Sequence, residues 1–179
     1  MSHTTSEHEV LATLFRELDA YSPILVGTFP LGVQVASSDL DVLCCAHDLV
    51  AFERQLERLL DGFWSVPFQC SRLHTQPEAS VTRFQWQGFA VEVFAQGVPV
   101  HQQAGFRHMI VEGRLLALGG DALRDRVRAE KRAGHKTEPA FARVLGLEGD
   151  PYQTLLTLEG AAQDELERLV RQAMQSPAR

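Results

Sequence analysis

Hydrophobic residues near the start of the chain follow first a helical and then a strand-like spacing. Ser6-Glu7-His8-Glu9 has the form of an N-terminal capping box, and the apolar residues that follow it at helical intervals are Val10, Leu11, Leu14, Phe15 and Leu18. We therefore predict a helix to about Ala20. Ser22-Pro23 ends it, and the apolar run at residues 24–26 predicts a short buried strand.

The next segments predict a second strand, a helix and a group of three strands. Leu40 to Cys45 is an apolar run entered through a polar turn, and Asp48 is placed to cap a helix that ends near Gly62. Three further strands are expected at about residues 63–72, 81–86 and 89–95. Gln87-Gly88 joins the last two and suits a two-residue hairpin turn.

From Pro99 onward the pattern becomes helical. Helices are predicted over residues 101–118 and 122–133, and Thr137 is placed to cap a short one before Gly146. Asp150 precedes Pro151, which suits a first helical turn, and opens a final helix to about Met174. The order predicts an α/β (α+β) protein with an α/β core at 1–97 and a helical half at 98–179, packed as one compact unit.

Composition is that of an ordinary globular protein, with 45% hydrophobic and 22% charged residues. The net charge of -6 argues against bulk binding to nucleic acid, which needs a positive field. No apolar run approaches the length of a membrane span, and Met1-Ser2-His3-Thr4-Thr5 lacks the features of a signal peptide. We expect a cytoplasmic protein that does not bind membranes.

The cysteine pattern supports neither a zinc site nor a redox pair. Cys44, Cys45 and Cys70 include no Cys-x-x-Cys spacing, and their number is odd. Buried, reduced thiols are the expected state of all three.

Two carboxylates at the start of the second strand carry the first chemical signal. In an extended strand, Asp39 and Asp41 project to the same side while Leu40 points to the other. Neighbouring carboxylates repel each other, and a divalent cation with its preference for oxygen ligands would cancel that repulsion. A turn residue followed by a strand charge is the alternative interpretation.

Glu92 supplies a candidate third carboxylate. It stands within the apolar run 89–94, where an unpaired charge is costly. If its strand lies beside that of Asp41, three carboxylates could hold two metal ions about 4 Å apart, as in nucleotidyl transfer. Alternatively, Glu92 forms a cross-strand ion pair, for example with Arg83.

Gly27-Thr28 follows the first predicted strand. Glycine lets the backbone approach a ligand closely, and the Thr28 hydroxyl with nearby N–H groups would hold a phosphate. A local backbone hydrogen bond of the hydroxyl is the alternative.

This stretch, from Gly27-Thr28 to Ser38-Asp39-Leu40-Asp41, resembles the pattern of the nucleotidyltransferase superfamily, in which a third acidic residue follows on a later strand. The chain also resembles a bacterial domain-of-unknown-function family of small nucleotidyltransferase-like proteins. That narrower resemblance rests on the same stretch and on four further segments, Pro99-Val100 with Gln103, Arg107-His108-Met109, Lys136-Thr137-Glu138-Pro139-Ala140-Phe141 and Gly149-Asp150-Pro151-Tyr152.

The resemblance implies a minimal nucleotidyltransferase fold with a mixed sheet flanked by helices. It also implies metal-dependent transfer of a nucleoside monophosphate from a nucleoside triphosphate to an unidentified hydroxyl, with Mg²⁺ or Mn²⁺ as cofactor. Asp39, Asp41 and Glu92 would then be the catalytic metal ligands, and Gly27, Thr28 and Ser38 would contact the nucleotide. Two alternatives stay open, a nucleotide-sensing or partner-binding module without turnover and a docking component of a larger complex.

The helical half offers two further polar groups. His101, His108 and Glu112 share one helical face, which either packs against the α/β half or lines the substrate cleft, where Arg107 would pair with a phosphate. The basic residues between Arg124 and Lys136 form either a solvated face or a cationic side of the nucleotide site. In the second interpretation Lys136, ahead of a helix N-terminus, binds phosphate.

Overall fold

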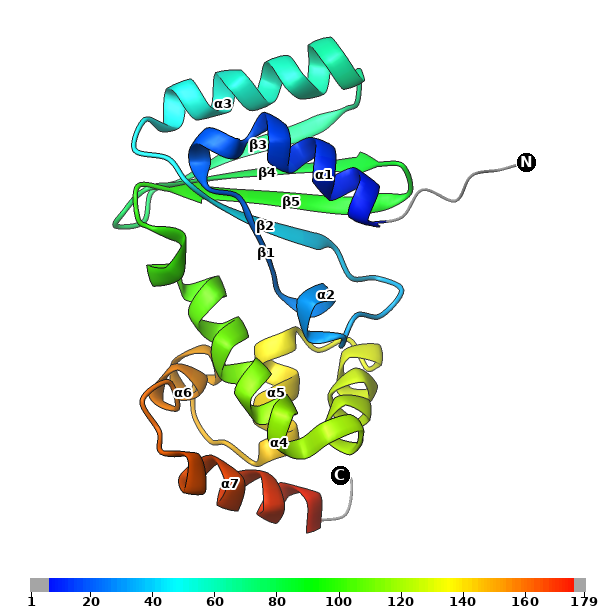
Figure 1. Ribbon diagram of the computed structural model, residues 1–179, viewed down its shortest axis with the longest axis vertical. Coiled ribbons are helices and arrows are strands. Elements are labelled where there is room, and N and C mark those ends of the chain that lie inside the picture. Colours follow the sequence, from blue (N-terminus) through cyan, green and yellow to red (C-terminus); the bar gives the residue numbers. More distant parts are fainter. Residues whose placement is uncertain (1–6, 176–179) are drawn as a thin grey trace, which may run out of the picture. The chain divides into compact units, whose positions relative to one another are not determined.

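The computed structural model of the protein describes residues 7–175 (Figure 1). Ser6 of the predicted capping box and the N-terminal residues Met1–Thr5 lie outside these described residues. The chain forms two compact units: the first contains the residues up to Val26 and Asp39–Gln103, and the second contains Gly27–Ser38 and the residues from Ala104 onward. The division at residues 97 and 98 into a core and a helical half stays a prediction.

A mixed five-stranded sheet forms the centre of the first unit, as the fold class predicts. Its strands are β1 (Ile24–Val26), β2 (Leu40–Cys45), β3 (Phe68–Leu73), β4 (Ala79–Trp86) and β5 (Phe89–Gln96). They lie in the order β1-β2-β5-β4-β3, and β2 and β5 run parallel while the other neighbours are antiparallel. The β4–β5 hairpin turns at Gln87 and Gly88, both with positive φ (49° and 91°), which confirms the predicted turn.

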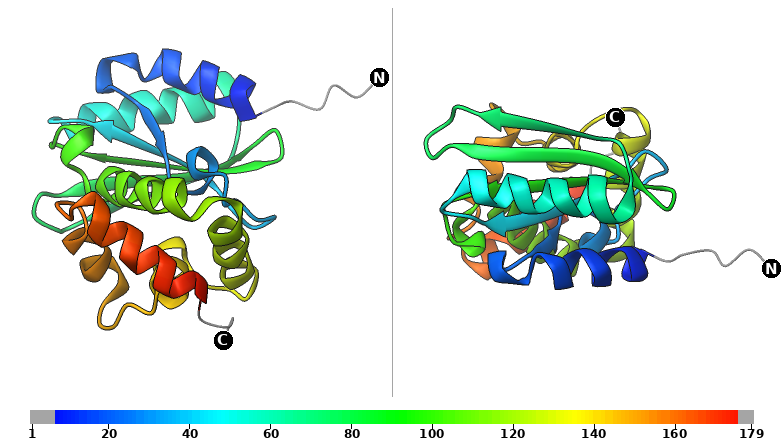
Figure 2. Two further views of the ribbon diagram at one scale, coloured as in Figure 1. Left: turned by 60° about the horizontal axis from the view of Figure 1, so that its bottom comes forward. Right: turned by 90° about the horizontal axis from the view of Figure 1, so that it is seen from above.

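Two helices cover one face of this sheet, α1 (Glu7–Glu17) and α3 (Leu49–Glu57) (Figures 1 and 2). Arg72 on β3 identifies the covered face, because its guanidinium binds Glu53 of α3 with a nitrogen–oxygen distance of 3.0 Å. Arg72, Ser80, Ala95 and Cys44 are register partners across four strands, and the last three are fully buried. The hydrophobic core of the first unit therefore lies between this face and the two helices.

Short irregular helices complete the first unit. A 3-10 turn, Asp19–Tyr21, follows α1, and another, Val100–Gln102, follows the sheet. The helix α3 continues into a π-helical stretch, Arg58–Trp64, that ends at Ser65 with φ 52°. Gly62 therefore lies inside helical structure, and the prediction that it ends the helix is wrong. Asp48 does cap α3, since its carboxylate accepts a hydrogen bond from the Ala51 N–H at 2.9 Å.

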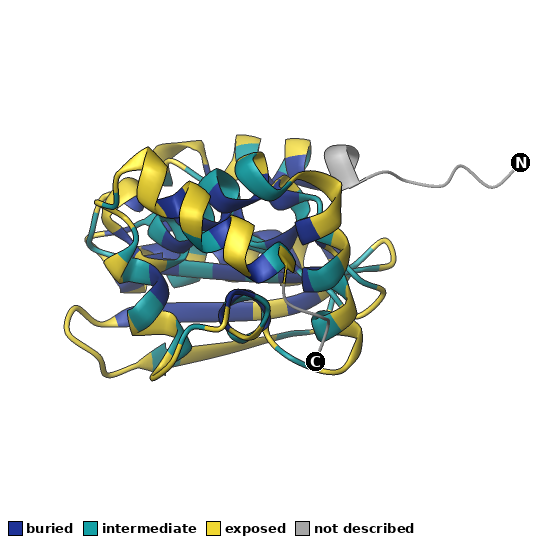
Figure 3. Ribbon diagram, turned by 90° about the horizontal axis from the view of Figure 1, so that it is seen from below, coloured by how far each residue is buried: buried dark blue, intermediate teal, exposed yellow. Residues whose placement is uncertain are grey.

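The second unit consists of helices. They are α2 (Thr28–Leu31), α4 (Ala104–Arg132), α5 (Thr137–Leu145), α6 (Pro151–Thr157) and α7 (Gln163–Gln175). Their buried faces meet in one hydrophobic cluster that includes Leu31 and Val33 as well as Leu115, Phe141 and Leu166. In Figure 3 these helices carry exposed residues on one side and buried residues on the other.

Three helix boundaries in the second unit differ from the sequence prediction or refine it. The two predicted helices of residues 101–133 form α4, which starts at Ala104 and is interrupted at Gly120 (φ 58°, ψ -151°). Thr137 is not the N-cap of α5; Lys136 holds that position, and the Thr137 hydroxyl accepts a hydrogen bond from Lys131 Nζ at 2.9 Å. The predicted final helix is two helices, α6 and α7, although Asp150 caps the first as expected.

The predicted burial of the cysteine thiols holds only for Cys44, because Cys45 is half-buried and Cys70 is exposed; all three are free. Burial, with a smaller effect of Cys45, raises the pKa of the Cys44 thiol to about 12. None of the helices within residues 7–175 combines the length and apolar character needed to cross a membrane.

Candidate functional site

A row of polar residues crosses the face of the sheet opposite the one that α1 and α3 cover. Asp41 on β2 is the register partner of Glu92 on β5, and Glu92 is the partner of Arg83 on β4. Register partners on neighbouring strands point to the same face, and this row lies three residues from the buried row of Cys44 and Ala95. Because three is an odd number, the two rows point to opposite faces. We call the face that carries Asp41, Glu92 and Arg83 the carboxylate face.

Asp39 precedes β2 by one residue and is half-buried, like Asp41. The predicted three-carboxylate site requires the strand of Glu92 to lie beside the strand of Asp41, and it does. Within the described residues, however, no group of three or more His, Cys, Asp or Glu side chains is placed to hold a metal ion. The donor types and the shared face suit Mg²⁺ or Mn²⁺, but the three carboxylates are not gathered into one ligand set. Their metal role stays a prediction.

Glu92 forms an ion pair with a residue of the neighbouring strand β4. The Arg83 guanidinium lies 2.6 Å from the Glu92 carboxylate, measured from Nη2 to Oε2. This is the cross-strand pair that the sequence left open as an alternative. The Glu92 side chain is 24% exposed and that of Arg83 is 57% exposed, so neither is sealed in the core. The printed contact engages Glu92 Oε2, and a carboxylate has a second oxygen with which it can bind a metal ion.

Gly27 and Thr28 belong to the second unit, where Gly27 directly precedes α2. Gly27 has φ 73° and ψ -140°, a conformation that favours glycine. The Thr28 hydroxyl is buried and has no hydrogen-bond partner among the described residues. A local backbone bond of that hydroxyl is therefore not formed, and a buried polar atom without a partner is costly.

Two arginines of α4 hold the end of the Gly27–Gly32 segment. Arg128 donates a hydrogen bond to the Gly32 carbonyl at 2.6 Å, and Arg124 makes a longer one, 3.4 Å, to the Leu31 carbonyl. These carbonyls end α2, so the guanidinium groups satisfy acceptors that the short helix leaves open. Sequence reasoning missed this role, because nothing local links residue 128 to residue 32.

Ser38 serves the loop that leads to Asp39. Its hydroxyl accepts a hydrogen bond from the Val35 N–H at 3.0 Å, and its own N–H donates to the Val35 carbonyl at 2.9 Å. These bonds fix the turn in front of the Asp-x-Asp sequence. The predicted contact of Ser38 with nucleotide is not tested by them.

The basic residues between Arg124 and Lys136 divide into two groups. Arg124, Arg126, Arg128 and Lys131 all donate hydrogen bonds within the second unit. Arg132 and Lys136 are exposed, and His135 lies 3.5 Å from Glu130. The first group thus stabilises the helical unit, and the exposed Arg132 and Lys136 belong to the second. The phosphate contact of Lys136 stays a prediction.

The face predicted from His101, His108 and Glu112 is divided. His101 belongs to the first unit, whereas His108 and Glu112 of α4 are 5% and 2% exposed within the second unit. His108 Nε2 lies 2.9 Å from the Tyr152 carbonyl, and its Nδ1 lies 3.6 Å from Glu138. This buried cluster joins three segments that the sequence showed only as separate motifs.

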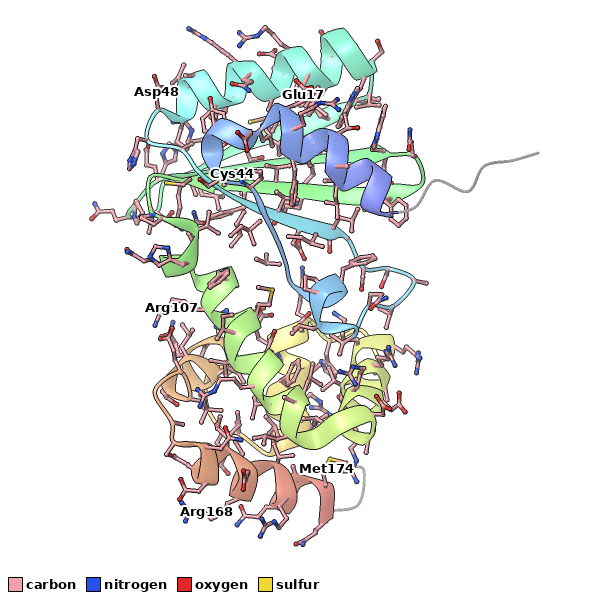
Figure 4. All side chains as sticks on the ribbon, viewed as in Figure 1. Glu17, Cys44, Asp48, Arg107, Arg168 and Met174 are labelled. Carbon is pink, nitrogen blue, oxygen red and sulfur yellow. The ribbon has the colours of Figure 1, made fainter. Side chains whose placement is uncertain are left out.

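Burial also changes the pKa of Glu112. Its removal from water raises its pKa well above 4.5, Glu138 raises it further, and Lys131 opposes the shift. Glu112 Oε1 has no hydrogen-bond partner among the described residues. Arg107, one residue before His108 and labelled in Figure 4, pairs with Glu159 at 2.6 Å, and its contact with phosphate stays a prediction.

Several solved structures are similar to this chain. The Cid1 poly(U) polymerase with MgGTP bound matches with a TM-score of 0.57 and 13% identity, over 78% of this chain and 48% of that one. The structure of the GLD-2/RNP-8 complex matches with a TM-score of 0.58 and 16% identity, over 96% of this chain and 68% of the other. A cytoplasmic RNA terminal U-transferase matches with a TM-score of 0.52 and 16% identity, over 70% and 38% of the two chains.

These similarities show that the chain has the fold of nucleotidyltransferase structures, as predicted. The chain spans about half the length of the first poly(U) polymerase structure that it matches. Residues 9–158 match the model of one protein family, and the chain belongs to that family, described as Domain of unknown function (DUF4269). No curated protein matches the chain.

Proposed function

We propose that this protein is a metal-dependent nucleotidyltransferase that moves a nucleoside monophosphate from a nucleoside triphosphate to a hydroxyl group. The observation that carries the proposal is the register of Asp41 with Glu92 on the carboxylate face, with Asp39 two residues before Asp41. Similar structures support it by what they contain, namely Cid1 with MgGTP and Cid1 with the UTP analogue UMPNPP. A Mg²⁺ or Mn²⁺ requirement and a cytoplasmic location belong to the same proposal.

Asp39, Asp41 and Glu92 would hold the divalent ions through their carboxylate oxygens. The ions, when bound, neutralise triphosphate charge and lower the pKa of the acceptor hydroxyl. The acceptor oxygen then forms a bond to the α-phosphorus, the bond from that phosphorus to the bridging oxygen breaks, and pyrophosphate leaves. A carboxylate takes the hydroxyl proton, and Glu92, once released from Arg83, is our candidate for it.

We propose the same residues as phosphate contacts that the sequence predicted. Gly27 and Thr28 offer a backbone conformation open to close approach and a hydroxyl without a partner. Arg124 and Arg128 would act only by fixing this segment, because they touch its carbonyls. Ser38 and Lys136 complete the set of proposed nucleotide contacts.

The test is release of pyrophosphate from each of the four nucleoside triphosphates, with Mg²⁺ or Mn²⁺, in the presence of a small-molecule extract and then of an RNA extract. Mass spectrometry of the mixture identifies the nucleotidylated product. Asp41→Asn should abolish release. Asp48→Asn is the matched control, because asparagine keeps the helix cap while the same charge is removed.

The outcomes separate the candidate functions. Release that depends on Asp41 supports an enzyme. Triphosphate binding without release in any extract would instead support the nucleotide-sensing module, and absence of binding would favour a docking component.

A further inference from the structure

The carboxylate face extends beyond Glu92 over β4 and β3, and the side chains there differ from those around Asp41. Gln69 is the register partner of Arg83, and Ser71 and Gln85 lie on the same face of the same two strands. All three are exposed, uncharged and able to donate hydrogen bonds. Among the residues of the five strands, Arg83 is the only lysine or arginine on this face.

Stability does not account for Arg83 at this position. Its partner Glu92 is not fully buried, and Arg83 itself is more than half exposed. Ion pairs at such exposure contribute little to folding, because water screens them and two long side chains lose freedom. In the Arg72–Glu53 pair on the covered face the arginine is only 27% exposed, against 57% for Arg83, while the two carboxylates are equally exposed at 24%.

The position of Arg83 fits the acceptor better than the triphosphate. Two strand spacings of roughly 4.8 Å separate its Cα from that of Asp41, so the two lie about 10 Å apart with Glu92 between them. A hydroxyl placed at Glu92 for proton removal would bring the rest of a small acceptor over Arg83. The guanidinium fork binds a phosphate or carboxylate through two parallel hydrogen bonds.

We infer that Arg83 is the anion-binding residue of an acceptor subsite on β4, and that the acceptor is a small hydroxyl compound carrying one phosphate or carboxylate group. This inference rests on the proposed function for its use of Glu92. One cation beside neutral Gln69, Ser71 and Gln85 matches one anionic group. A nucleic-acid acceptor would require several cations along its backbone, and the protein carries a net charge of -6.

The ion pair then has a second effect. Glu92 lies between Asp41 and Arg83 in the register, and its Oε2 pairs with the guanidinium. An anionic group that binds Arg83 would compete for the guanidinium and release Glu92. Acceptor binding and metal binding should therefore strengthen each other, since the same carboxylate serves both.

The first experiment uses no metal and no triphosphate. Phosphate monoesters of small polyols and small hydroxy acids are each titrated beside the parent polyol or neutral analogue, with the arginine Nε–Hε NMR signals as the readout. We expect one signal, absent in Arg83→Gln, to shift with the anionic compounds only, and Arg83→Gln to bind them at least tenfold more weakly. Arg143→Gln is the control, because Arg143 is 53% exposed and also forms a 2.6 Å ion pair, with Glu130.

The second experiment measures Mn²⁺ affinity by calorimetry. Arg83→Gln should bind Mn²⁺ about threefold more tightly or better, because a nearby positive charge is removed and Glu92 is freed, whereas Arg143→Gln should match the wild type. Equal anion binding by Arg83→Gln, an equal response to the neutral analogues, or preferential binding of a single-stranded RNA oligonucleotide that survives Arg83→Gln would overturn the inference. Anion binding at Arg83 without pyrophosphate release would defeat the proposed function and leave the subsite standing.

Discussion

Asp41 and Glu92 lie opposite each other on β2 and β5, the parallel pair of the sheet. Parallel neighbours cannot be joined by a tight turn, and here the chain forms α3, β3 and β4 before it returns as β5. Asp39 and Asp41 are close in sequence, whereas Glu92 is brought beside Asp41 only because the chain returns as β5. The carboxylate face is thus a product of topology, and its parts can be tested separately.

Metal binding should depend on the two aspartates. We expect Asp39→Asn or Asp41→Asn to weaken Mn²⁺ binding at least tenfold in calorimetry, with little change in thermal unfolding. Loss of repulsion between carboxylates should offset any lost contact and can raise the melting temperature of the metal-free protein. Asp48→Asn provides the comparison, and Mn²⁺ affinity unchanged in both aspartate variants would refute the metal assignment.

Glu112 should make the protein less stable as the pH rises. Its pKa in the folded state lies well above 4.5, through burial first and Glu138 second, with Lys131 opposed. The folded state therefore binds more protons than the unfolded state above about pH 4.5, and the free energy of unfolding falls with pH until the folded pKa is passed. Glu112→Gln has the shape of the neutral acid but cannot titrate, so the free energy of unfolding of this variant should depend less on pH.

Urea unfolding at intervals from pH 5 to pH 8 measures this difference. The titratable groups that act on Glu112, Glu138 and Lys131, are retained in the variant, as are His108 on the same helix and Tyr152, which contacts His108. Glu148→Gln, at an exposed position, should follow the wild-type curve. Parallel curves for wild type and Glu112→Gln would contradict the prediction.

Gly120 should be required for the interruption of α4. Its φ of 58° with ψ of -151° lies in a region that side chains rarely adopt, so Gly120→Ala should lower the free energy of unfolding by about 1–3 kcal/mol. Gly62 is the control, because it has helical surroundings and open space at its Cβ position. Gly62→Ala should be neutral or stabilising by up to about 1 kcal/mol, and equal effects of the two changes in urea unfolding would disprove the special role of Gly120.

Lys136 should contribute to triphosphate binding if the cationic interpretation of its segment is correct. It is exposed, it is the N-cap of the nine-residue helix α5, and helix N-termini attract anions. We expect Lys136→Ala to weaken triphosphate binding by about 1–2 kcal/mol, and the loss to shrink at high salt. Arg132→Ala removes the same charge from an exposed site nearby, and equal losses in calorimetry would indicate a general charge effect without a specific contact.

The sequence predicted those parts of the fold that depend on neighbouring residues. The bounds of β1 and β2, the Gln87-Gly88 turn and the Asp48 cap all follow from local spacing and local hydrogen bonds. The site was predictable to the same extent, because Asp39 and Asp41 share a face by alternation alone. Even the Arg83–Glu92 pair was a defined alternative, since a hairpin fixes which residues face each other.

What the sequence missed depends on distant partners. The predicted final helix breaks before α7, and Arg114 of α4 donates hydrogen bonds to the carbonyls of Glu159 and Ala161 at that break, each at 2.8 Å. Lys131 likewise donates a hydrogen bond to the hydroxyl of Thr137, the residue that the sequence predicted as the N-cap of α5. Such interactions join residues by tertiary packing, and no spacing rule along the chain reports them.

The interleaved path of the chain limits how the protein can be divided. Residues 27–38 leave the first unit and return to it, and within that stretch Leu31 and Val33 are buried in the cluster formed by α4, α5 and α7. A fragment that stopped after Gln103 would keep the whole sheet yet expose these apolar side chains and leave the Leu31 and Gly32 carbonyls without Arg124 and Arg128. We therefore expect that neither unit folds by itself when it is cut from the chain near residue 103. Recombination or gene fusion at that point would separate residues 27–38 from the helices against which they pack.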